Sequence, residues 1–148
     1  MKNLKFSFLL LSALAVVTIS SLTSCQCDQS KLFNKTWVLE KYGPESALQG
    51  AIPGTPPAKG EILLELDGNG HFSGNDGCNG ISGVYKLGGD CQIKFDSMKT
   101  TMMMCQEAVM QQAVNINGLF RNVKTYRVTN NKLELRTPDK GVLWYKKK

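Results

Sequence analysis

The sequence predicts an α+β domain in which a curved, barrel-like antiparallel sheet of roughly eight short strands packs around one amphipathic helix. Short runs of β-branched and aromatic residues follow one another along the chain, and most are separated by tight turns containing Gly, Asn or Asp. Only the segment after Cys105 carries apolar residues at three- and four-residue steps over several turns. Strands joined by tight turns pair in an antiparallel sheet, and we expect the single helix to cover that sheet.

The N-terminus has the composition of a secretory signal peptide, expected over residues 1–24. Lys2 and Lys5 supply a basic start, and residues 6–17 form an uncharged apolar stretch. This stretch is too short to favour a permanent membrane span. We therefore expect residues 1–24 to be removed during export.

The sequence Leu-Thr-Ser-Cys at residues 22–25 resembles a bacterial lipobox, in which a signal peptidase cleaves before the cysteine and its thiol is acylated. An ordinary signal peptide with an incidental cysteine is the alternative. We expect the mature protein to begin at Cys25, held in a membrane leaflet by lipid chains such as palmitate. Residues 25–31 would be a short tether and residues 32–146 the domain. Gln26 favours the outer membrane, by resemblance to enterobacterial sorting.

The charge balance does not point to nucleic acid. The chain has 18 Lys and Arg against 12 Asp and Glu, and part of this excess lies in the signal peptide. Nucleic-acid binding needs basic residues interleaved with exposed aromatic residues on one face, a pattern that is absent here. Residues 146–148 are lysines that form a solvated tail and would strengthen attachment to anionic lipid headgroups weakly. The expected partners are the membrane, through the lipid anchor, and an envelope protein or a small ligand.

The first half of the domain consists of expected strands and turns. Strands are predicted at residues 36–42, 61–66, 71–73, 81–87 and 92–95. Asp67-Gly68-Asn69-Gly70 is expected to form a hairpin turn, with glycine supplying positive φ angles. Residues 43–60 carry four prolines and predict a long irregular loop, which is either functional or a plain surface insertion.

One amphipathic helix is expected after Cys105, ending near Asn122. Its apolar stripe consists of Val109, Ala113, Ile116, Phe120 and Val123. Cys105 continues this stripe one turn backwards, so its sulfur is expected to point at the sheet. Three strands then close the domain, at residues 124–129, 133–137 and 142–145.

Two cysteine-containing motifs give the chain a family resemblance. The sequence Gly-x-x-Gly-Cys-Asn-x-x-Ser-Gly-x-Tyr spans residues 74–85, and Thr-x-Met-x-Cys follows at residues 101–105. Together these motifs resemble the META domain family. The resemblance covers about residues 32–144 and implies the fold and a cell-envelope setting, but no reaction. Relatives often carry a basic residue directly after the threonine of the second motif. This chain has Met102 there, so no role of that basic group is carried over.

Four cysteines follow Cys25, and export would place them in an oxidising compartment where disulfides persist. Four cysteines allow three full pairings, and the residues alone do not choose among them. The resemblance implies a disulfide between Cys78 and Cys105, with two buried free thiols as the alternative. Cys27 and Cys91 would then be free, paired with each other, or paired with another chain.

No residue pattern predicts an enzyme or a cofactor. A nucleophilic Cys78 would need a histidine within hydrogen-bond reach and a third group to orient it. His71 is the only histidine, and nothing in the sequence marks an orienting group. No Gly-x-Ser-x-Gly elbow is present either.

The sequence contains one candidate for a soft-metal site and one for calcium. Candidate ligands for a copper(I) site are Met98, the methionines at 102–104, Cys105 and Met110, because thioether and thiolate sulfurs are soft ligands. Methionine is also an adaptable filler of irregular cores, and we expect core packing. The turn at residues 67–70 departs from the EF-hand pattern. We therefore expect no metal site.

We expect a non-enzymatic, lipid-anchored cell-envelope protein that acts through its surface. The resemblance implies a role in envelope integrity or stress tolerance. Loops on a braced scaffold are common recognition sites, so we expect a binding surface around the loop at 43–60 and the turn at 76–81. Its candidate residues are Gly50, Pro53, Pro56, Asp76 and Asn79. The alternatives are a small-ligand carrier, which needs an internal cavity, and an inhibitor of an extracellular hydrolase, which needs a rigid protruding loop.

Overall fold

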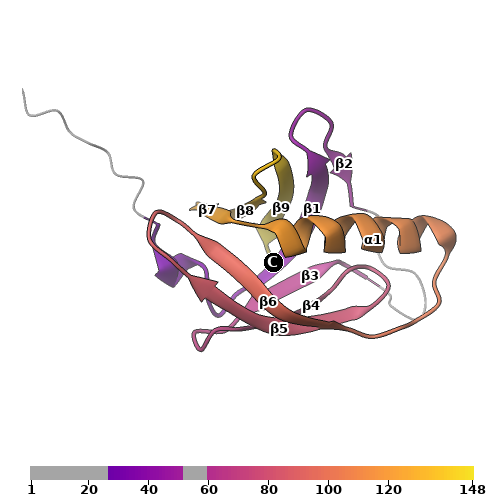
Figure 1. The fold of residues 1–148 in the computed structure, drawn as a ribbon, viewed down its shortest axis with the longest axis horizontal. Helices are drawn as coiled ribbons and strands as arrows, with labels where there is room; N and C mark the ends of the chain where they lie inside the picture. Colours follow the sequence, from indigo (N-terminus) through magenta and orange to yellow (C-terminus); the bar gives the residue numbers. More distant parts are fainter. Residues whose placement is uncertain (1–26, 52–59) are drawn as a thin grey trace, which may run out of the picture.

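The structure, a computed structural model, describes residues 27–51 and 60–148, which form one curled sheet and one long helix (Figure 1). The helical elements are the short 3-10 helix η1 (Gln29–Lys31) and α1 (Glu107–Asn122). The strands are β1 (Thr36–Pro44), β2 (Gln49–Gly50), β3 (Leu63–Leu66), β4 (His71–Asn75), β5 (Gly80–Leu87), β6 (Ile93–Thr100), β7 (Thr125–Thr129), β8 (Lys132–Arg136) and β9 (Gly141–Lys147). The predicted α+β class with a curved antiparallel sheet and one helix is confirmed.

The strand order of the sheet is β6-β5-β4-β3-β1-β9-β8-β7, with β2 paired to the side of β1. Every strand pair in the described part of the chain is antiparallel. The two outer strands approach each other at one end, because Gln92 bridges Thr125 and the N–H of Tyr126 donates to the carbonyl oxygen of Cys91 over 2.9 Å. The sheet is therefore curled like a barrel, and α1 lies across its concave side against β1, β6 and β9 (Figure 1).

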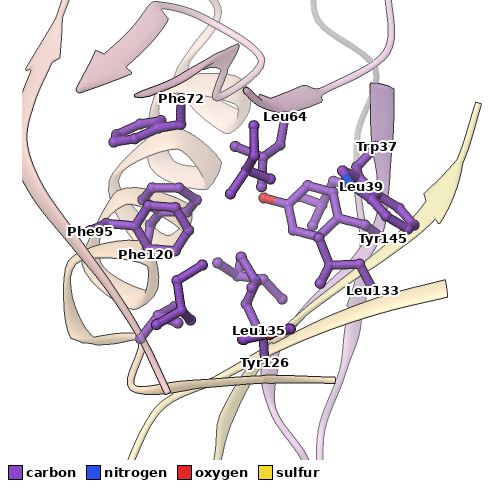
Figure 2. Packing of buried hydrophobic residues seen from close by; sticks show 14 of the residues in the cluster. Trp37, Leu39, Leu64, Phe72, Phe95, Phe120, Tyr126, Leu133, Leu135 and Tyr145 are labelled. Carbon is purple, nitrogen blue, oxygen red and sulfur yellow. The ribbon is translucent and has the colours of Figure 1, made fainter. Parts of the chain in front are cut away.

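The space between the sheet and α1 is filled by aromatic and aliphatic side chains (Figure 2). The ring centroids of Phe95 and Phe120 lie 4.1 Å apart, and Phe72 lies 5.1 Å from Phe95. Trp37 and Tyr145 are buried on the other side of the same cluster. In the described part of the chain, aromatic and aliphatic side chains thus occupy the interior between the sheet and α1.

Helix α1 buries the face that the periodicity predicts, and it ends at Asn122 as expected. Its buried side chains are Val109, Gln112, Ala113, Ile116 and Phe120. Gln112 is the one polar residue in this set, and the spacing of apolar residues does not predict that it is buried. In the described part of the chain, no helix is long and apolar enough to span a bilayer.

The predicted loop at residues 43–60 is wrong in its first part, which is a hairpin. Strand β1 continues to Pro44, and β2 pairs with it through Lys41 opposite Gly50 and Tyr42 opposite Gln49. Gly43 has φ of +122°, a conformation that glycine adopts without strain and that lets the chain turn back. Pro44 is tolerated because it stands at the end of the strand, where its missing N–H is not needed.

Strand β6 is longer than the predicted segment 92–95, because a bulge carries it on to Thr100. The register of β5 and β6 shifts between Ser82 and Val84, and Ser97 adopts φ of +49° opposite this point. The bulge lets polar Lys99 pair with Ser82 beyond the apolar part of the strand. The strand therefore extends up to the second cysteine motif.

Candidate functional site

Cys78 and Cys105 form a disulfide, as the family resemblance implies. Their Cα atoms lie 5.9 Å apart, across a sequence separation of 27 residues. Cys78 is fully buried and packs with Val109 and Ala113 of α1, so the bond fixes the β4–β5 turn to the start of the helix. The sulfur of Cys78 is thus not a free thiol. His71 lies elsewhere, with its side chain 65% exposed and its Nδ1 3.3 Å from Oδ2 of Asp67.

Asp76 holds the β4–β5 turn from the inside. Its side chain is fully buried, and Oδ1 accepts hydrogen bonds from the N–H of Cys78 at 2.9 Å and of Asn79 at 2.6 Å. Oδ2 accepts a third from Nδ2 of Asn117 at 2.8 Å. A carboxylate with three donors is well satisfied in the interior. The expectation that Asp76 lies on a binding surface is therefore corrected: it braces the turn beneath that surface.

Asn79, the neighbouring candidate, is half-buried and holds the segment that precedes α1. Its Oδ1 accepts from the N–H of Met103 at 2.8 Å and from Oγ1 of Thr101 at 3.3 Å. Thr101 and Gly80 exchange two further hydrogen bonds of 3.0 Å each. We call residues 101–105 the methionine segment. It is tied to the β4–β5 turn along its whole length.

The expected core packing is wrong for the methionines of this segment. Met102 is 100% exposed, Met104 is 90% exposed and Met103 is 39% exposed. Met110, on the first turn of α1, is 37% exposed. Met98 alone packs against the core, partly buried. The reason is backbone geometry: the hydrogen bonds to the β4–β5 turn leave the side chains between them pointing to solvent.

Cys27 and Cys91 form a second disulfide, which resolves the pairing left open by the sequence. Their Cα atoms lie 5.4 Å apart across 64 residues of sequence. The next residues form η1, where Asp28 accepts hydrogen bonds from Ser30, and these hold the pKa of Asp28 below its usual value. The predicted tether at 25–31 is thus already part of the fold from Cys27 onward. Cys25 itself lies outside the described residues.

A groove runs between the β1–β2 hairpin, α1 and the β8–β9 turn, beside Gly50. Its volume is about 450 Å³, and its lining includes Tyr42, Gln49 and Leu119. Tyr42 is buried at its base and hydrogen-bonds to the side chain of Asn115, and burial raises the pKa of Tyr42. Figure 1 shows the hairpin rising beside the helix. Sequence reasoning missed this groove, because the hairpin that forms one wall was read as a loop.

The remaining predicted surface residues are not brought together with the groove. Asn79 lies at the β4–β5 turn rather than at the hairpin. Pro53 and Pro56 lie outside the described residues. Among the described residues, no group of three or more His, Cys, Asp or Glu side chains is placed to hold a metal ion.

The comparisons with known proteins identify the fold. A sequence model of the META domain matches residues 30–148. An NMR structure of a protein from Burkholderia xenovorans has a TM-score of 0.66 at 20% identity, covering 80% of this chain and 85% of that one. A second NMR structure has a TM-score of 0.60 at 22% identity, covering 79% and 92%. The crystal structure of a DUF4847 family protein from Bacteroides vulgatus has a TM-score of 0.56 at 13% identity, covering 80% and 95%. No curated protein matches the chain.

Proposed function

The chain belongs to the META domain family, and on this premise we propose that it is a non-enzymatic, lipid-anchored interaction module of the bacterial cell envelope, acting in envelope integrity or stress tolerance. The secretory N-terminus and the lipobox-like residues 22–25 support the anchor. Both pairs of cysteines are joined in disulfides, which persist in oxidising compartments and support export.

The observation that carries the proposal is the position of the two disulfides at opposite ends of the domain. Strand β5 is 8 residues long, or about 26 Å at 3.3 Å per residue. Cys78 lies just before its start, and Cys91 lies just after its end. In Figure 1 the N-terminal end of the described chain and the segment entering α1 are at opposite ends of the long axis.

The linker between the expected lipid anchor at Cys25 and the folded domain is very short. Cys25 precedes Cys27 by two residues, so at most about 7 Å of extended chain separates the acylated residue from a disulfide-bonded one. A domain held this close stands on the membrane with the Cys27 end down. The β4–β5 turn and the methionine segment then face away from the bilayer.

The groove beside the β1–β2 hairpin is the proposed contact surface for an envelope protein. At its rim Val114 is 65% exposed, so the groove has an apolar edge that is open to solvent. The filled interior favours this surface role over a carrier role. The groove is built on a strand pair and a helix, so its shape does not depend on binding.

Two measurements test the proposal separately. Mass spectrometry of the N-terminal peptide of the mature protein is expected to show acylated Cys25, and an unmodified N-terminal peptide would remove the lipid anchor from the proposal. Capture from cross-linked envelopes tests the surface. Val114→Glu is expected to abolish partner capture, because it puts a charge on the groove rim without disturbing the core.

The control for the capture experiment is Lys99→Glu, which also adds an acidic side chain at an exposed position, here on β6. This variant is expected to capture the same partner as the wild type. Circular dichroism of both variants checks that they fold. If Val114→Glu captures the same proteins as Lys99→Glu, the groove is not the contact surface.

A further inference from the structure

The methionine segment presents two almost fully exposed thioethers at the end of the domain away from Cys27. Met102 is 100% exposed and Met104 is 90% exposed. Together they give this end of the domain an exposed, sulfur-bearing apolar surface. No part of the described chain covers them, so their chemistry is available to solutes.

The hydrogen bonds of the segment place these two side chains on one face. The N–H of Thr101 donates to the carbonyl oxygen of Gly80 at 3.0 Å, and the N–H of Met103 donates to Oδ1 of Asn79 at 2.8 Å. Alternate N–H groups that point the same way are the signature of an extended chain, in which side chains two positions apart share a face. Met102 and Met104 therefore project together, from Cα atoms about 6.6 Å apart.

Two thioethers in this relation are able to reach one ion. Each sulfur sits at the end of a flexible side chain with three rotatable bonds. Metal–sulfur bonds are about 2.3 Å long at zinc, so two sulfurs on opposite sides of an ion lie about 4.6 Å apart. That separation is shorter than the spacing of the two Cα atoms, and the side chains only need to lean toward each other.

The backbone under the two methionines is fixed before any ion arrives. Both ends of the methionine segment are anchored. Cys105 at its end is bonded to Cys78, and Thr101 at its start makes two hydrogen bonds with Gly80. A preorganised backbone lowers the ordering cost of binding to that of the two side chains.

The chemistry of the site selects soft monovalent ions. Thioethers are soft, neutral ligands that prefer Cu(I) and its analogue Ag(I) over Zn(II). The thiolates that would otherwise attract Cu(I) are absent at this end, because Cys78 and Cys105 are bonded to each other. Thioethers also carry no proton, so binding does not compete with protonation as it does at Cys or His.

We propose that Met102 and Met104 form a binding site for Cu(I). The candidate for a third thioether ligand is Met110, which lies on the first turn of α1 and whose side chain is 37% exposed. The site needs neither the lipid anchor nor the groove, so its test is independent of the proposed function.

The test uses the full mature protein in detergent micelles, labelled with ¹³C at the methionine methyl groups and titrated with Ag(I), which does not change oxidation state. The methyl resonances of Met102 and Met104 are expected to shift and saturate together, while that of Met98 stays in place. The affinity is expected to be the same at pH 5.5 and pH 7.5. A separate titration with Cu(I) under ascorbate, without Ag(I), is expected to shift and saturate the same two methyl resonances.

The double variant Met102→Leu, Met104→Leu is expected to lower the Ag(I) affinity at least about tenfold. Both side chains are exposed, so the variant keeps the fold, and Met98→Leu is the matched control that keeps the affinity. The variant Met110→Leu reports on the third ligand through a smaller loss. Wild-type affinity in the double variant, shifts that never saturate, or equal displacement by Zn(II) would each overturn the proposal.

Discussion

Asn117 in the middle of α1 donates a hydrogen bond of 2.8 Å from Nδ2 to Oδ2 of Asp76, which lies 41 residues earlier in the β4–β5 turn. This bond ties the turn to α1, and the Cys78–Cys105 disulfide ties the same turn to the segment just before α1. Together they make the far end of the domain stiff, and the methionine segment is displayed from this stiff base. Loss of either link is therefore expected to lower the free energy of unfolding.

Replacing Asp76 by Ala is expected to lower the free energy of unfolding by about 2–4 kcal/mol, because the backbone donors at Cys78 and Asn79 are left in the interior without an acceptor. Urea unfolding followed by circular dichroism measures the change. The control is Glu65→Ala, which removes an exposed carboxylate with one hydrogen bond from Thr36. This control should cost less than about 1 kcal/mol. Equal losses in the two variants would contradict the bracing role of Asp76.

The two disulfides are expected to differ in their contribution to stability, because they close loops of different length. On the chain-entropy model, the separation of 27 residues between Cys78 and Cys105 corresponds to about 3.6 kcal/mol. The separation of 64 residues between Cys27 and Cys91 corresponds to about 4.3 kcal/mol. Guanidinium unfolding of the two double Cys→Ala variants measures both losses. An unchanged midpoint for the variant without Cys27 and Cys91 would argue that this disulfide does not form in solution.

Much of this architecture follows from local pattern. The apolar stripe of α1, the turn at residues 67–70 and the three final strands are all encoded within windows of a few residues, and the structure has them close to the predicted bounds. The proline content of residues 43–60 predicts a loop where the β1–β2 hairpin begins, whereas a proline at a strand end does not prevent pairing. The pairing of Cys27 with Cys91 does not follow from the sequence, because disulfide connectivity depends on the tertiary fold.

The candidate site was harder to predict than the fold, because its properties depend on contacts between distant residues. Hydrophobicity alone places Met102 in the core, and only the hydrogen bond between Asn79 and Met103 turns the neighbouring side chains outward. Gly83 is similar: a Cβ there would lie 2.7 Å from the ring of Phe72 and 2.8 Å from the carbonyl oxygen of Asp96. The sequence marks this glycine as unusual, but the reason is the close approach of two other strands.

The stability of the domain is expected to fall in alkaline solution, with Tyr85 as a main contributor. Burial, and then the charge of Asp67, raise the pKa of Tyr85 from 10.0 to about 12. A pKa that is higher in the folded state means that the stabilisation is complete below pH 10 and is lost as the pH rises through 12. The full loss corresponds to about 2–3 kcal/mol.

The variant Tyr85→Phe isolates this contribution. It loses the hydrogen bond from the Tyr85 hydroxyl to the carbonyl oxygen of Asp67, so it is expected to be less stable than the wild type by about 1 kcal/mol at pH 8. Between pH 10 and pH 12 its stability should fall less steeply. Tyr145, Tyr42 and Tyr126, whose pKa values burial also raises, leave the variant a residual slope. Urea midpoints measured at each pH give both curves, and parallel curves would contradict the assignment to Tyr85.

The exposure of the methionine segment predicts an order of oxidation. Hydrogen peroxide transfers an oxygen atom to a thioether sulfur and is itself reduced to water, and the reaction requires access to the sulfur. Met102 and Met104, which are 100% and 90% exposed, are expected to be oxidised first, and Met98, which packs against the core, last. Peptide mass spectrometry over a time course measures the three rates. Because the sulfoxides of Met102 and Met104 point into solvent, their formation should leave the unfolding midpoint unchanged within error, whereas later oxidation of Met98 should lower it. If Met98 and Met102 are oxidised at equal rates, the side chain of Met102 is not held in solvent, and the hydrogen bonds of Asn79 do not fix the methionine segment in solution.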